Sequence, residues 1–349
     1  MKILYGIAGE GLGHATRSEV IIRHLLANGH EIRIITSGKA FDFLSKRFPE
    51  IIKKIEGFSL NIEENKLNIQ KSITGTLLTI PKKLGTNTPA FLSPFKKFKP
   101  DIVISDFESF TYLYAKVHRK PIIAIDNIHT VNRCKIDYPK KFRKLFLFSK
   151  TIISSKLPAC NQYLLSSFFN PEPKRKNTQI VPPIIRPEIL SAIPEKQDHI
   201  LVYLSGKAYP SLINILKNIS ENFIVYGFNK NDKEKNIQFR EFSSETFIED
   251  LRTAKAVIST SGYSLISESI FLKKPFFAIP LLNQFEQILN AHYLKKLGFG
   301  QYHLEITEGH LKNFLKKCPK YENALSKYKQ NENKELFKKL EEILKKLSK

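Results

Sequence analysis

Residues 256–291 read AVISTSGYSLISESIFLKKPFFAIPLLNQFEQILNA, and they alternate apolar runs with helical patterns. The apolar run 256–259 leads into a turn of small residues, and a helical pattern then continues to Leu272. The order repeats at once, because the apolar run 276–279 leads into a second helix that begins near Glu286. Strands that alternate with helices in this way are typical of a parallel sheet covered on both faces.

The same alternation extends over the chain of 349 residues. Apolar runs in the first half predict one set of strands, at 2–7, 31–36, 101–105, 121–126 and 151–154. A second set follows a proline-rich stretch, at 199–204, 223–226, 256–259 and 276–279. Prolines interrupt helices and strands, so the stretch between the two sets fits a linker. We therefore predict an α/β protein with two Rossmann-like domains, each a doubly wound parallel sheet, that face each other across a cleft.

The predicted domain boundaries follow from this restart. Residues 1–184 form the N-terminal domain, 185–198 the linker and 199–321 the C-terminal domain. The tail, 322–349, is rich in Lys and Glu and has an apolar residue at every third or fourth position. This spacing predicts an amphipathic helix, which we expect to pack back on the N-terminal domain.

Composition narrows the class of protein. Apolar residues make up 42% of the chain, which allows a core in each domain and is not typical of disorder. The three cysteines, Cys134, Cys160 and Cys318, have neither metal-ligand nor disulfide spacing. No apolar run approaches the ~18 residues of a membrane helix, and the run 3–8 is too short for a signal peptide. A cytoplasmic protein is therefore expected.

The net charge of +23 is large. A basic field attracts nucleic acids, anionic lipid headgroups or phosphorylated substrates, and composition does not choose among them. The segment 140–148, KKFRKLFLF, interleaves basic and apolar side chains, a pattern that can lie on an anionic membrane surface. A solvated basic face around a buried apolar stripe explains the segment equally well.

The first apolar run leads into a glycine-rich loop, AGEGLGH at 8–14, and then into a helix. Glycines let the backbone approach a ligand closely, and a helix N-terminus attracts anions. The glycine spacing is not that of a dinucleotide fingerprint, and the acid expected after the second strand is missing, so NAD binding is disfavoured. His14 directly follows the glycines at the sheet edge where open α/β sheets bind ligands. It is a candidate functional residue, with a structural role as the alternative.

The second candidate site lies in the opening stretch. The turn 260–264 can present backbone amides and hydroxyl groups to a phosphate. Glu268, about two helical turns further on, suits the vicinal hydroxyls of a ribose. Glu286 and Gln287 begin the next helix and can hydrogen-bond a sugar, although they can also simply cap that helix.

Three pieces taken together, SGYSLISE, KKP and PLLNQFEQILNA, resemble the donor-binding signature of nucleotide-sugar glycosyltransferases of the GT-B fold. The likeness is to families 1 and 28, which include UDP-glucosyl and glucuronosyl transferases and the N-acetylglucosamine transferase of lipid II synthesis. GEGLGHATRS matches the N-terminal glycine–histidine loop of that superfamily, and PDIVISD at 100–106 is similar to its strand–acid pattern. The nearest likeness is to a bacterial and archaeal branch that shares the GEGLGH loop.

The resemblance implies a nucleotide-diphosphate sugar, by expectation a UDP-sugar, in the C-terminal domain. Gly262 would face the diphosphate, Glu268 the ribose, and Glu286 with Gln287 the transferred sugar, while a loop near Phe247 would hold the base. The implied donor-contacting set is Gly13, Ser205, Gly206, Phe247, Ser261, Gly262, Tyr263, Ser264, Glu268, Glu286 and Gln287.

The resemblance also implies the chemistry. His14 would be the general base and Asp106 the carboxylate that orients it, with Glu10 as the fallback base. The reaction would be an inverting transfer of a hexose to an acceptor hydroxyl, without a redox cofactor or a metal ion. The N-terminal domain would bind the acceptor, by expectation a lipid-linked or cell-envelope glycan, at a peripheral position on the inner face of the membrane. The acceptor-side residues would be Arg17, Asp126 and His129.

Departures from the family pattern leave the donor open. Thr260 stands where plant enzymes carry a phosphate-binding His, Ser264 where they have Asn, and Glu286 where they have Asp. A nucleotide-sugar 2-epimerase shares the fold and is the alternative enzyme. A nucleotide-sugar or nucleic-acid binding protein is the non-enzyme alternative, although the sequence contains no recognised nucleic-acid module, so nucleic acid is not an expected partner.

Overall fold

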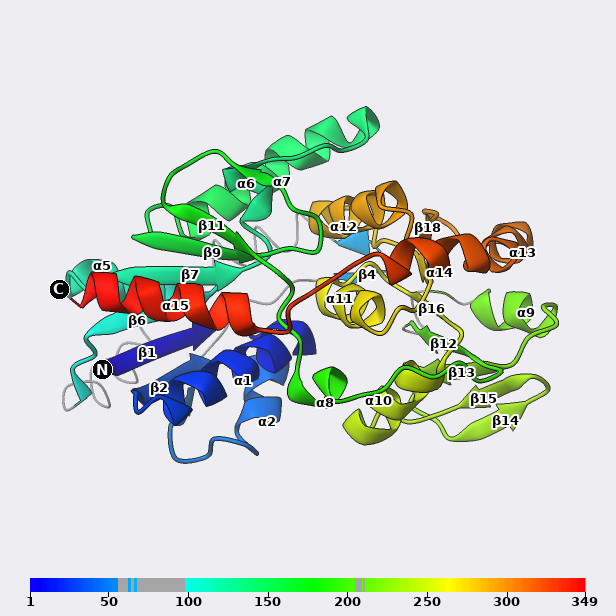
Figure 1. The fold of residues 1–349 in the computed structure, drawn as a ribbon, viewed down its shortest axis with the longest axis horizontal. Coiled ribbons are helices and arrows are strands. Elements are labelled where there is room, and N and C mark those ends of the chain that lie inside the picture. The colour runs from blue at the N-terminus through cyan, green and yellow to red at the C-terminus, as the bar shows by residue number, and fades with distance from the viewer. Residues whose placement is uncertain (56–61, 64–65, 68–97, 205–208, 210, 349) are drawn as a thin grey trace.

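The computed structural model describes residues 1–55, 62–63, 66–67, 98–204, 209 and 211–348. Two seven-stranded sheets lie side by side, one in each half of the chain (Figure 1). The predicted α/β class with doubly wound parallel sheets is confirmed. In the described part of the chain, no helix is both long and apolar enough to cross a bilayer.

The N-terminal sheet is parallel throughout. Its strands in spatial order are β11 (Thr178–Val181), β9 (Gln162–Ser166), β7 (Ile122–Asp126), β6 (Ile102–Asp106), β1 (Lys2–Ile7), β2 (Glu31–Thr36) and β3 (Ile52–Lys54). Its helices are α1 (Leu12–Ala27), α2 (Gly38–Leu44), α5 (Ser109–Val117), α6 (Thr130–Arg133) and α7 (Arg143–Lys156), with the short 3-10 helix η1 (Lys140–Phe142) before α7.

Both faces of this sheet are buried, which explains its continuous apolar strands. Ile3, Tyr5 and Ile7 of β1 join the core under α1 and α2, whereas Leu4 joins the core under α5. Alternate residues of one strand thus serve two cores, because successive side chains point to opposite faces.

The C-terminal sheet is parallel except for β14, which runs antiparallel to β15 at one edge. Its strands in spatial order are β14 (Asp232–Glu234), β15 (Ile237–Phe239), β13 (Phe223–Tyr226), β12 (Ile200–Tyr203), β16 (Ala256–Ser259), β17 (Phe276–Ala278) and β18 (Gly300–Tyr302). Its helices are α8 (Pro187–Leu190), α9 (Leu212–Lys217), α10 (Ser244–Thr253), α11 (Tyr263–Phe271), α12 (Phe285–Lys296), α13 (Glu308–Lys316) and α14 (Cys318–Ser326). Two short antiparallel ribbons lie outside the two sheets, β8 (Cys134–Lys135) with β10 (Glu172–Pro173) and β4 (Ile62–Glu63) with β5 (Lys66–Leu67).

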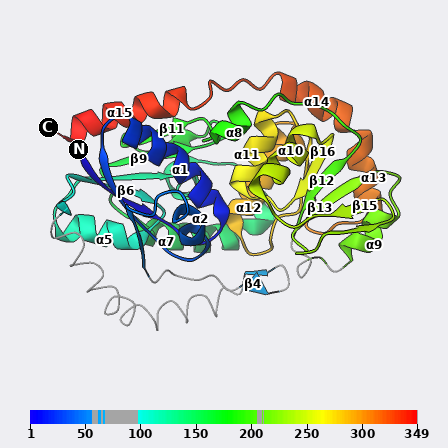
Figure 2. The same ribbon diagram turned by 90° about the horizontal axis from the view of Figure 1, so that it is seen from below.

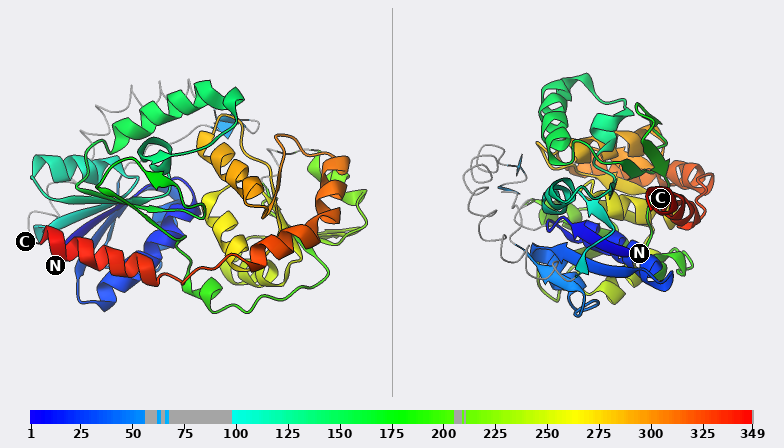
Figure 3. Two further views of the ribbon diagram at one scale, coloured as in Figure 1. Left: turned by 45° about the horizontal axis from the view of Figure 1, so that its top comes forward. Right: turned by 90° about the vertical axis from the view of Figure 1, so that its left-hand side faces the viewer.

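The tail differs from the single helix predicted for 322–349. It contains the end of α14 and then α15 (Lys334–Leu347), and α15 crosses back to lie on the N-terminal sheet (Figures 1 and 3). Leu336 and Leu340 of α15 pack in the same core as β1. The break covers residues 327–333 and ends at Asn333. This buried residue bonds both the amide and the carbonyl of Ile185 and so fixes the crossing point.

The strand predicted at 151–154 is wrong. Those residues lie in the last turns of α7, and the place of the strand in the sheet is taken by β9. Ile153 is the only residue of α7 classed as buried, so the apolar run 151–153 is one turn of an amphipathic helix. A run this short does not distinguish a strand from a helical turn by periodicity.

Candidate active site

His14 and Asp106 come together at the carboxyl edge of the N-terminal sheet. Asp106 ends β6, and Ile7 ends the neighbouring strand β1 beside it. The chain turns from β1 into α1 at Gly11, whose φ of 87° is in the region that favours glycine. His14 lies in the first turn of α1, and its Nδ1 is 2.9 Å from Oδ1 of Asp106. The two side chains are therefore within hydrogen-bonding distance.

Arg17 shares the Asp106 carboxylate with His14. Its Nε donates to Oδ2 of Asp106 at 2.7 Å, and its Nη2 lies 2.8 Å from Nδ1 of His14. Asp106 is 1% exposed, and Arg17 is also buried. Burial alone would raise the pKa of Asp106, but Arg17 and then His14 outweigh burial and hold this pKa well below its ordinary value. Asp106 is therefore ionised at neutral pH.

The position of Arg17 differs from the prediction, which placed it on the acceptor side. It is buried because a carboxylate inside the protein requires a counter-charge. Its Nη1 also donates to Oδ1 of Asn127, which directly follows β7. Sequence reasoning missed Asn127, since no motif surrounds it.

Asn127 joins the two halves of the chain. Its Nδ2 donates to Oε1 of Glu286 at 2.8 Å, and the same oxygen accepts from Nδ2 of Asn290 at 3.1 Å. Asn290 also donates to the backbone carbonyl of Ser261 at 3.0 Å. A continuous hydrogen-bonded path therefore runs from His14, through Asp106, Arg17, Asn127, Glu286 and Asn290, to the loop before α11.

The N-termini of α1 and α11 meet next to this path (Figure 2). Oγ of Ser264 lies 3.4 Å from the carbonyl oxygen of Gly13. A Cβ atom on Gly13 would lie only 2.8 Å from that Oγ, so any larger residue there would force Ser264 to move. Each helix N-terminus carries a partial positive charge and free N–H groups. Two of them side by side suit a dianionic group such as a diphosphate.

The side chains of Ser261 and Tyr263, which the resemblance placed in contact with the donor, are both buried. Ser261 is fully buried, and its Oγ has no hydrogen-bond partner among the described residues. Tyr263 is buried as well, and its hydroxyl bonds Oγ of Ser166 in the N-terminal domain at 2.7 Å. Gly262, which is half-buried, leaves the backbone amides as the groups that can meet a ligand.

Glu268 has a partner that the sequence did not reveal. Arg186, the residue before α8, donates to both of its carboxylate oxygens, from Nε at 2.8 Å and from Nη2 at 2.9 Å. Both side chains are largely buried. Burial alone would lower the pKa of Arg186, but Glu268 outweighs it and raises this pKa. Glu268, the residue predicted to bind the ribose, is thus held by Arg186 of the linker between the domains.

The side chain of Gln287 is engaged by the loop that precedes α12, and it does not cap that helix. Its Oε1 accepts from the backbone N–H of Leu281, and its Nε2 donates to Oε1 of Gln284, both at 3.0 Å. Gln287 is buried and holds the loop before α12, whereas Glu286 is half-buried.

In the loop predicted to bind the base, the exposed aromatic ring is that of Phe242 and not that of the predicted Phe247. Phe247 is 3% exposed and packs in the core against Tyr203 and Tyr226. Phe242 is 44% exposed and lies over Tyr203, with the ring centroids 6.0 Å apart. An inward-facing helix position buries Phe247, so Phe242 is the ring that a nucleobase can reach. Ser205 and Gly206 lie outside the described residues.

Asp126 and His129 are also not on an acceptor surface, because both are fully buried. Oδ2 of Asp126 lies 2.7 Å from Nδ1 of His129, and Oδ1 accepts from the backbone N–H of His129 at 2.8 Å. The two side chains pair with each other inside the domain. Glu10, the fallback base, is half-buried in the loop after β1 and interacts electrostatically with Lys156.

Metal-ligand clusters are absent from the described residues, since no three His, Cys, Asp or Glu side chains lie together in a way that could hold an ion.

Comparison with known proteins places this site in context. Residues 1–319 match the model of the family described as glycosyl transferase family 1. An uncharacterized glycosyltransferase of Methanosarcina mazei is 29% identical over 340 residues, 86% of this chain and 85% of that protein. A UDP-N-acetylglucosamine–N-acetylmuramyl-(pentapeptide) pyrophosphoryl-undecaprenol N-acetylglucosamine transferase of Bacillus cereus is 36% identical over 86 residues, 24% of each chain.

Two solved structures show the same fold. A UDP-glucosyltransferase from Polygonum tinctorium superposes with a TM-score of 0.69 at 13% identity, covering 100% of this chain and 98% of that one. The glycosyltransferase VinC, in complex with DTDP, superposes with a TM-score of 0.65 at 12% identity, covering 100% and 99%. The GT-B fold implied by the sequence resemblance is therefore confirmed.

Proposed function

The chain belongs to glycosyl transferase family 1, and from this membership we propose that it transfers a hexose from a nucleotide-diphosphate donor to an acceptor hydroxyl with inversion. The observation that carries the proposal is the hydrogen-bonded path from His14 to the loop before α11. It joins a candidate base in one domain to a phosphate-suited helix terminus in the other. Chemistry at such a junction needs groups from both domains.

His14 is the proposed general base. The proposal requires the tautomer of His14 that carries its proton on Nδ1, with Nη2 of Arg17 donating to Oδ1 of Asp106 and not to the imidazole. In that tautomer Nδ1 donates to Asp106, and the lone pair of Nε2 is left for the acceptor hydroxyl. The acceptor oxygen then forms a bond to the anomeric carbon, and the bond from that carbon to the phosphate oxygen breaks. The electron pair leaves with the nucleoside diphosphate, and the proton goes to Nε2. Because Arg17 keeps Asp106 ionised, the orienting carboxylate stays in place through the cycle.

The departing diphosphate is proposed to lie where α1 and α11 meet. Backbone N–H groups of two helix N-termini would stabilise the charge that develops there. Glu286 bonds Asn127 and Asn290 through Oε1, and among the described residues nothing donates to its Oε2, which suits a sugar hydroxyl. Because the helix N-termini would carry the charge of the diphosphate, transfer is proposed to need no metal ion. Activity that disappears with a chelator and returns with Mg²⁺ would refute this part of the proposal.

The donor is proposed to be a UDP-sugar. Support comes from the names of the similar Polygonum tinctorium and Bacillus cereus enzymes, both of which refer to UDP compounds. The ribose would add its hydroxyls to the carboxylate of Glu268, which Arg186 holds in place. The exposed ring of Phe242 would stack on the base.

The acceptor is proposed to be lipid-linked or a cell-envelope glycan, reached from the inner face of the cytoplasmic membrane. Support comes from η1 and α7, where Lys140, Lys141 and Lys144 stand near Leu147, which is 50% exposed. Basic and apolar side chains on one exposed helix suit an anionic bilayer surface.

Thermal stabilisation by a panel of sugar nucleotides tests the donor, because a ligand that binds the folded state raises the melting temperature by mass action. A UDP-sugar should give the largest shift. Loss of the donor in the absence of any acceptor, with an epimer as product, would instead establish an epimerase. Absence of stabilisation by every sugar nucleotide would refute donor binding.

A further inference from the structure

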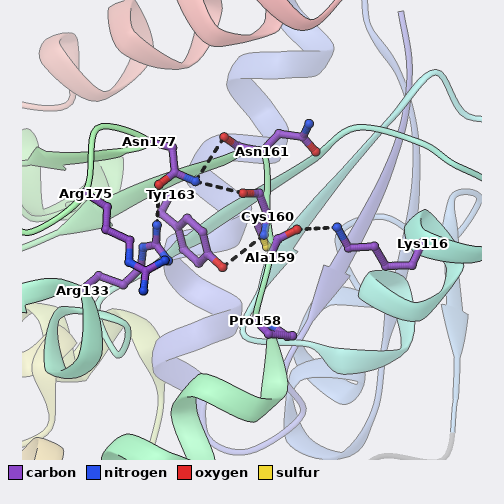
Figure 4. A pocket seen from close by; sticks show the side chains of 9 residues that line it. All are labelled: Lys116, Arg133, Pro158, Ala159, Cys160, Asn161, Tyr163, Arg175 and Asn177. Carbon is purple, nitrogen blue, oxygen red and sulfur yellow. Dashed lines mark hydrogen bonds between the residues drawn. The ribbon is translucent and has the colours of Figure 1, made fainter.

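A pocket of about 250 Å³ lies in the N-terminal domain, away from the junction of the two domains (Figure 4). Asn161 and Asn177 line it, and these residues directly precede β9 and β11. The pocket is therefore at the amino ends of those strands, whereas His14 and Asp106 lie at the carboxyl edge of the sheet. Nothing in the proposed transfer reaction uses it.

The most buried charge in the pocket belongs to Arg133, which is 6% exposed. The guanidinium carbon lies 3.5 Å from the ring centroid of Tyr163. Nε donates to Oγ1 of Thr178 at 2.8 Å, and Nη2 donates to Oδ1 of Asn177. Within the described part of the chain, Nη1 has no acceptor. Two nitrogens thus fix the guanidinium, and the third is left for a ligand.

Two further cations line the same pocket. Arg175 lies beside Arg133 in Figure 4, and Lys116 lies at the opposite end, where its Nζ donates to the carbonyl of Ala159. Among the residues that the structure describes, no carboxylate pairs with any of the three. Burial lowers the pKa of Arg133, and the charge of Arg175 adds to this effect. A buried guanidinium without a counter-charge is costly, so the pocket favours an anion.

We propose that this pocket binds the phosphate group of a small molecule or a lipid headgroup. Arginine forks match the oxygens of phosphate, and two arginines, one lysine and the side-chain amide of Asn161 can serve several oxygens at once. The amide of Asn177 already bonds Arg133 and the carbonyl of Cys160, so it holds the pocket wall in place. The volume is below the range of about 300–1,000 Å³ typical of pockets for drug-sized ligands. A phosphomonoester therefore fits better than a nucleotide sugar, and the site is separate from the donor site.

The test compares binding of inorganic phosphate and of glycerol phosphate, by calorimetry at constant ionic strength, to the full chain and its variants. Arg175→Ala with Lys116→Ala removes two charges from exposed residues, so the fold should survive. Arg133→Lys keeps the charge but loses the fork. Lys176→Ala is the matched control, because Lys176 is exposed in the same loop and does not line the pocket. The double variant and Arg133→Lys should each bind at least tenfold more weakly, and the control should bind as the wild type does.

Equal affinity of the wild type and the double variant for every phosphate probe, vesicles included, would overturn the proposal. An equal loss in Lys176→Ala would also overturn it, because it would reveal only a diffuse basic field. Phosphatidylcholine vesicles with and without phosphatidic acid distinguish the two sources of phosphate. Dependence on Arg175 for the free phosphates identifies a soluble ligand. The same dependence for vesicles alone identifies a lipid headgroup, and dependence in neither overturns the proposal.

Discussion

Asp106 is a buried carboxylate that serves two partners with different roles. Arg17 supplies the counter-charge of Asp106, and Asp106 in turn orients the imidazole ring of His14. A simple His–Asp pair would leave the carboxylate balanced by the histidine alone. The extra guanidinium separates the two tasks, so in the proposed mechanism the charge of Asp106 would stay compensated whether or not His14 holds a second proton.

Replacing Asp106 tests this assignment through stability. Asp106→Asn leaves Arg17 buried without a counter-charge and should cost about 3 kcal/mol at pH 7. Because the folded-state pKa of Asp106 is depressed, its contribution is fully present above the unfolded pKa of about 4 and is lost as the pH falls below it. The difference in free energy of unfolding between wild type and variant, from urea melts, should shrink below about pH 4.

Asp42→Asn is the control for that comparison, since Asp42 is exposed on α2. It should change stability by no more than about 0.5 kcal/mol. An Asp106→Asn variant as stable as the control at pH 7 would show that the ion pair is not needed.

Arg186 and Glu268 form the second buried pair. Removing either partner alone strands a charge, and we expect a loss of about 3 kcal/mol from Arg186→Met or Glu268→Gln. The double variant should lose less than the sum of the two, because neither charge remains. Urea melts of the four proteins measure the coupling, and strict additivity would contradict a direct pair.

At the scale of elements, the contact between α1 and α11 brings two positive helix ends together. Gly13 makes this possible, because its missing side chain leaves room for Ser264. The glycine loop therefore has a packing role between the domains, in addition to the diphosphate binding proposed for it.

Gly13→Ala should separate the packing role from helix propensity. With Ser264 present, the added Cβ meets Oγ at 2.8 Å, and a net loss of about 1 kcal/mol is expected. In a Ser264→Ala background, the nearest atom is the Cβ of residue 264 at 3.5 Å, an ordinary contact. Alanine should then stabilise the helix by up to about 1 kcal/mol. Thermal melts that show the same sign in both backgrounds would disprove the contact.

Sequence patterns predicted the strands and helices better than they predicted which side chains contact one another. The runs 256–259 and 276–279 became β16 and β17, because buried parallel strands are continuous apolar segments. The strand predicted at 151–154 was wrong, since one turn of an amphipathic helix has the same composition as a short strand. Arg186 and Glu268 are 82 positions apart, and no periodicity connects residues so distant. Asp126 and His129 are fully buried, and a sequence motif does not show whether its residues are buried or exposed.

The whole molecule is held as one unit by features that cross between the sheets. α15 returns to the first sheet, and one apolar cluster contains Phe168 and Phe169 together with Tyr263 and Phe285. The polar path from His14 to Ser261 lies within this junction. The candidate site therefore depends on how the two domains sit together.

The net charge of +23 is a property of the whole molecule, and it would attract the protein to an anionic membrane surface. Binding to vesicles that contain anionic lipid should weaken about tenfold or more between low salt and physiological salt, because surface charges are screened over about 8–10 Å. Replacing Lys140, Lys141 and Lys144 with Gln should weaken binding, whereas Gln at the exposed Lys316, Lys317 and Lys320 should not. Co-sedimentation measures both, and salt-independent binding would argue against electrostatic attachment.

Sugar transfer by His14→Ala tests whether His14 is the general base. The measurement follows radiolabelled sugar from the stabilising sugar nucleotide to a panel of soluble and lipid-linked hydroxyl acceptors, with donor affinity measured in parallel. His118→Ala, an exposed histidine at the end of α5, is the matched control. We predict that His14→Ala lowers the transfer rate at least a hundredfold with donor affinity unchanged, since general base catalysis typically contributes about 10²–10⁴-fold. Transfer at the wild-type rate by His14→Ala would contradict the assignment of His14 as the base.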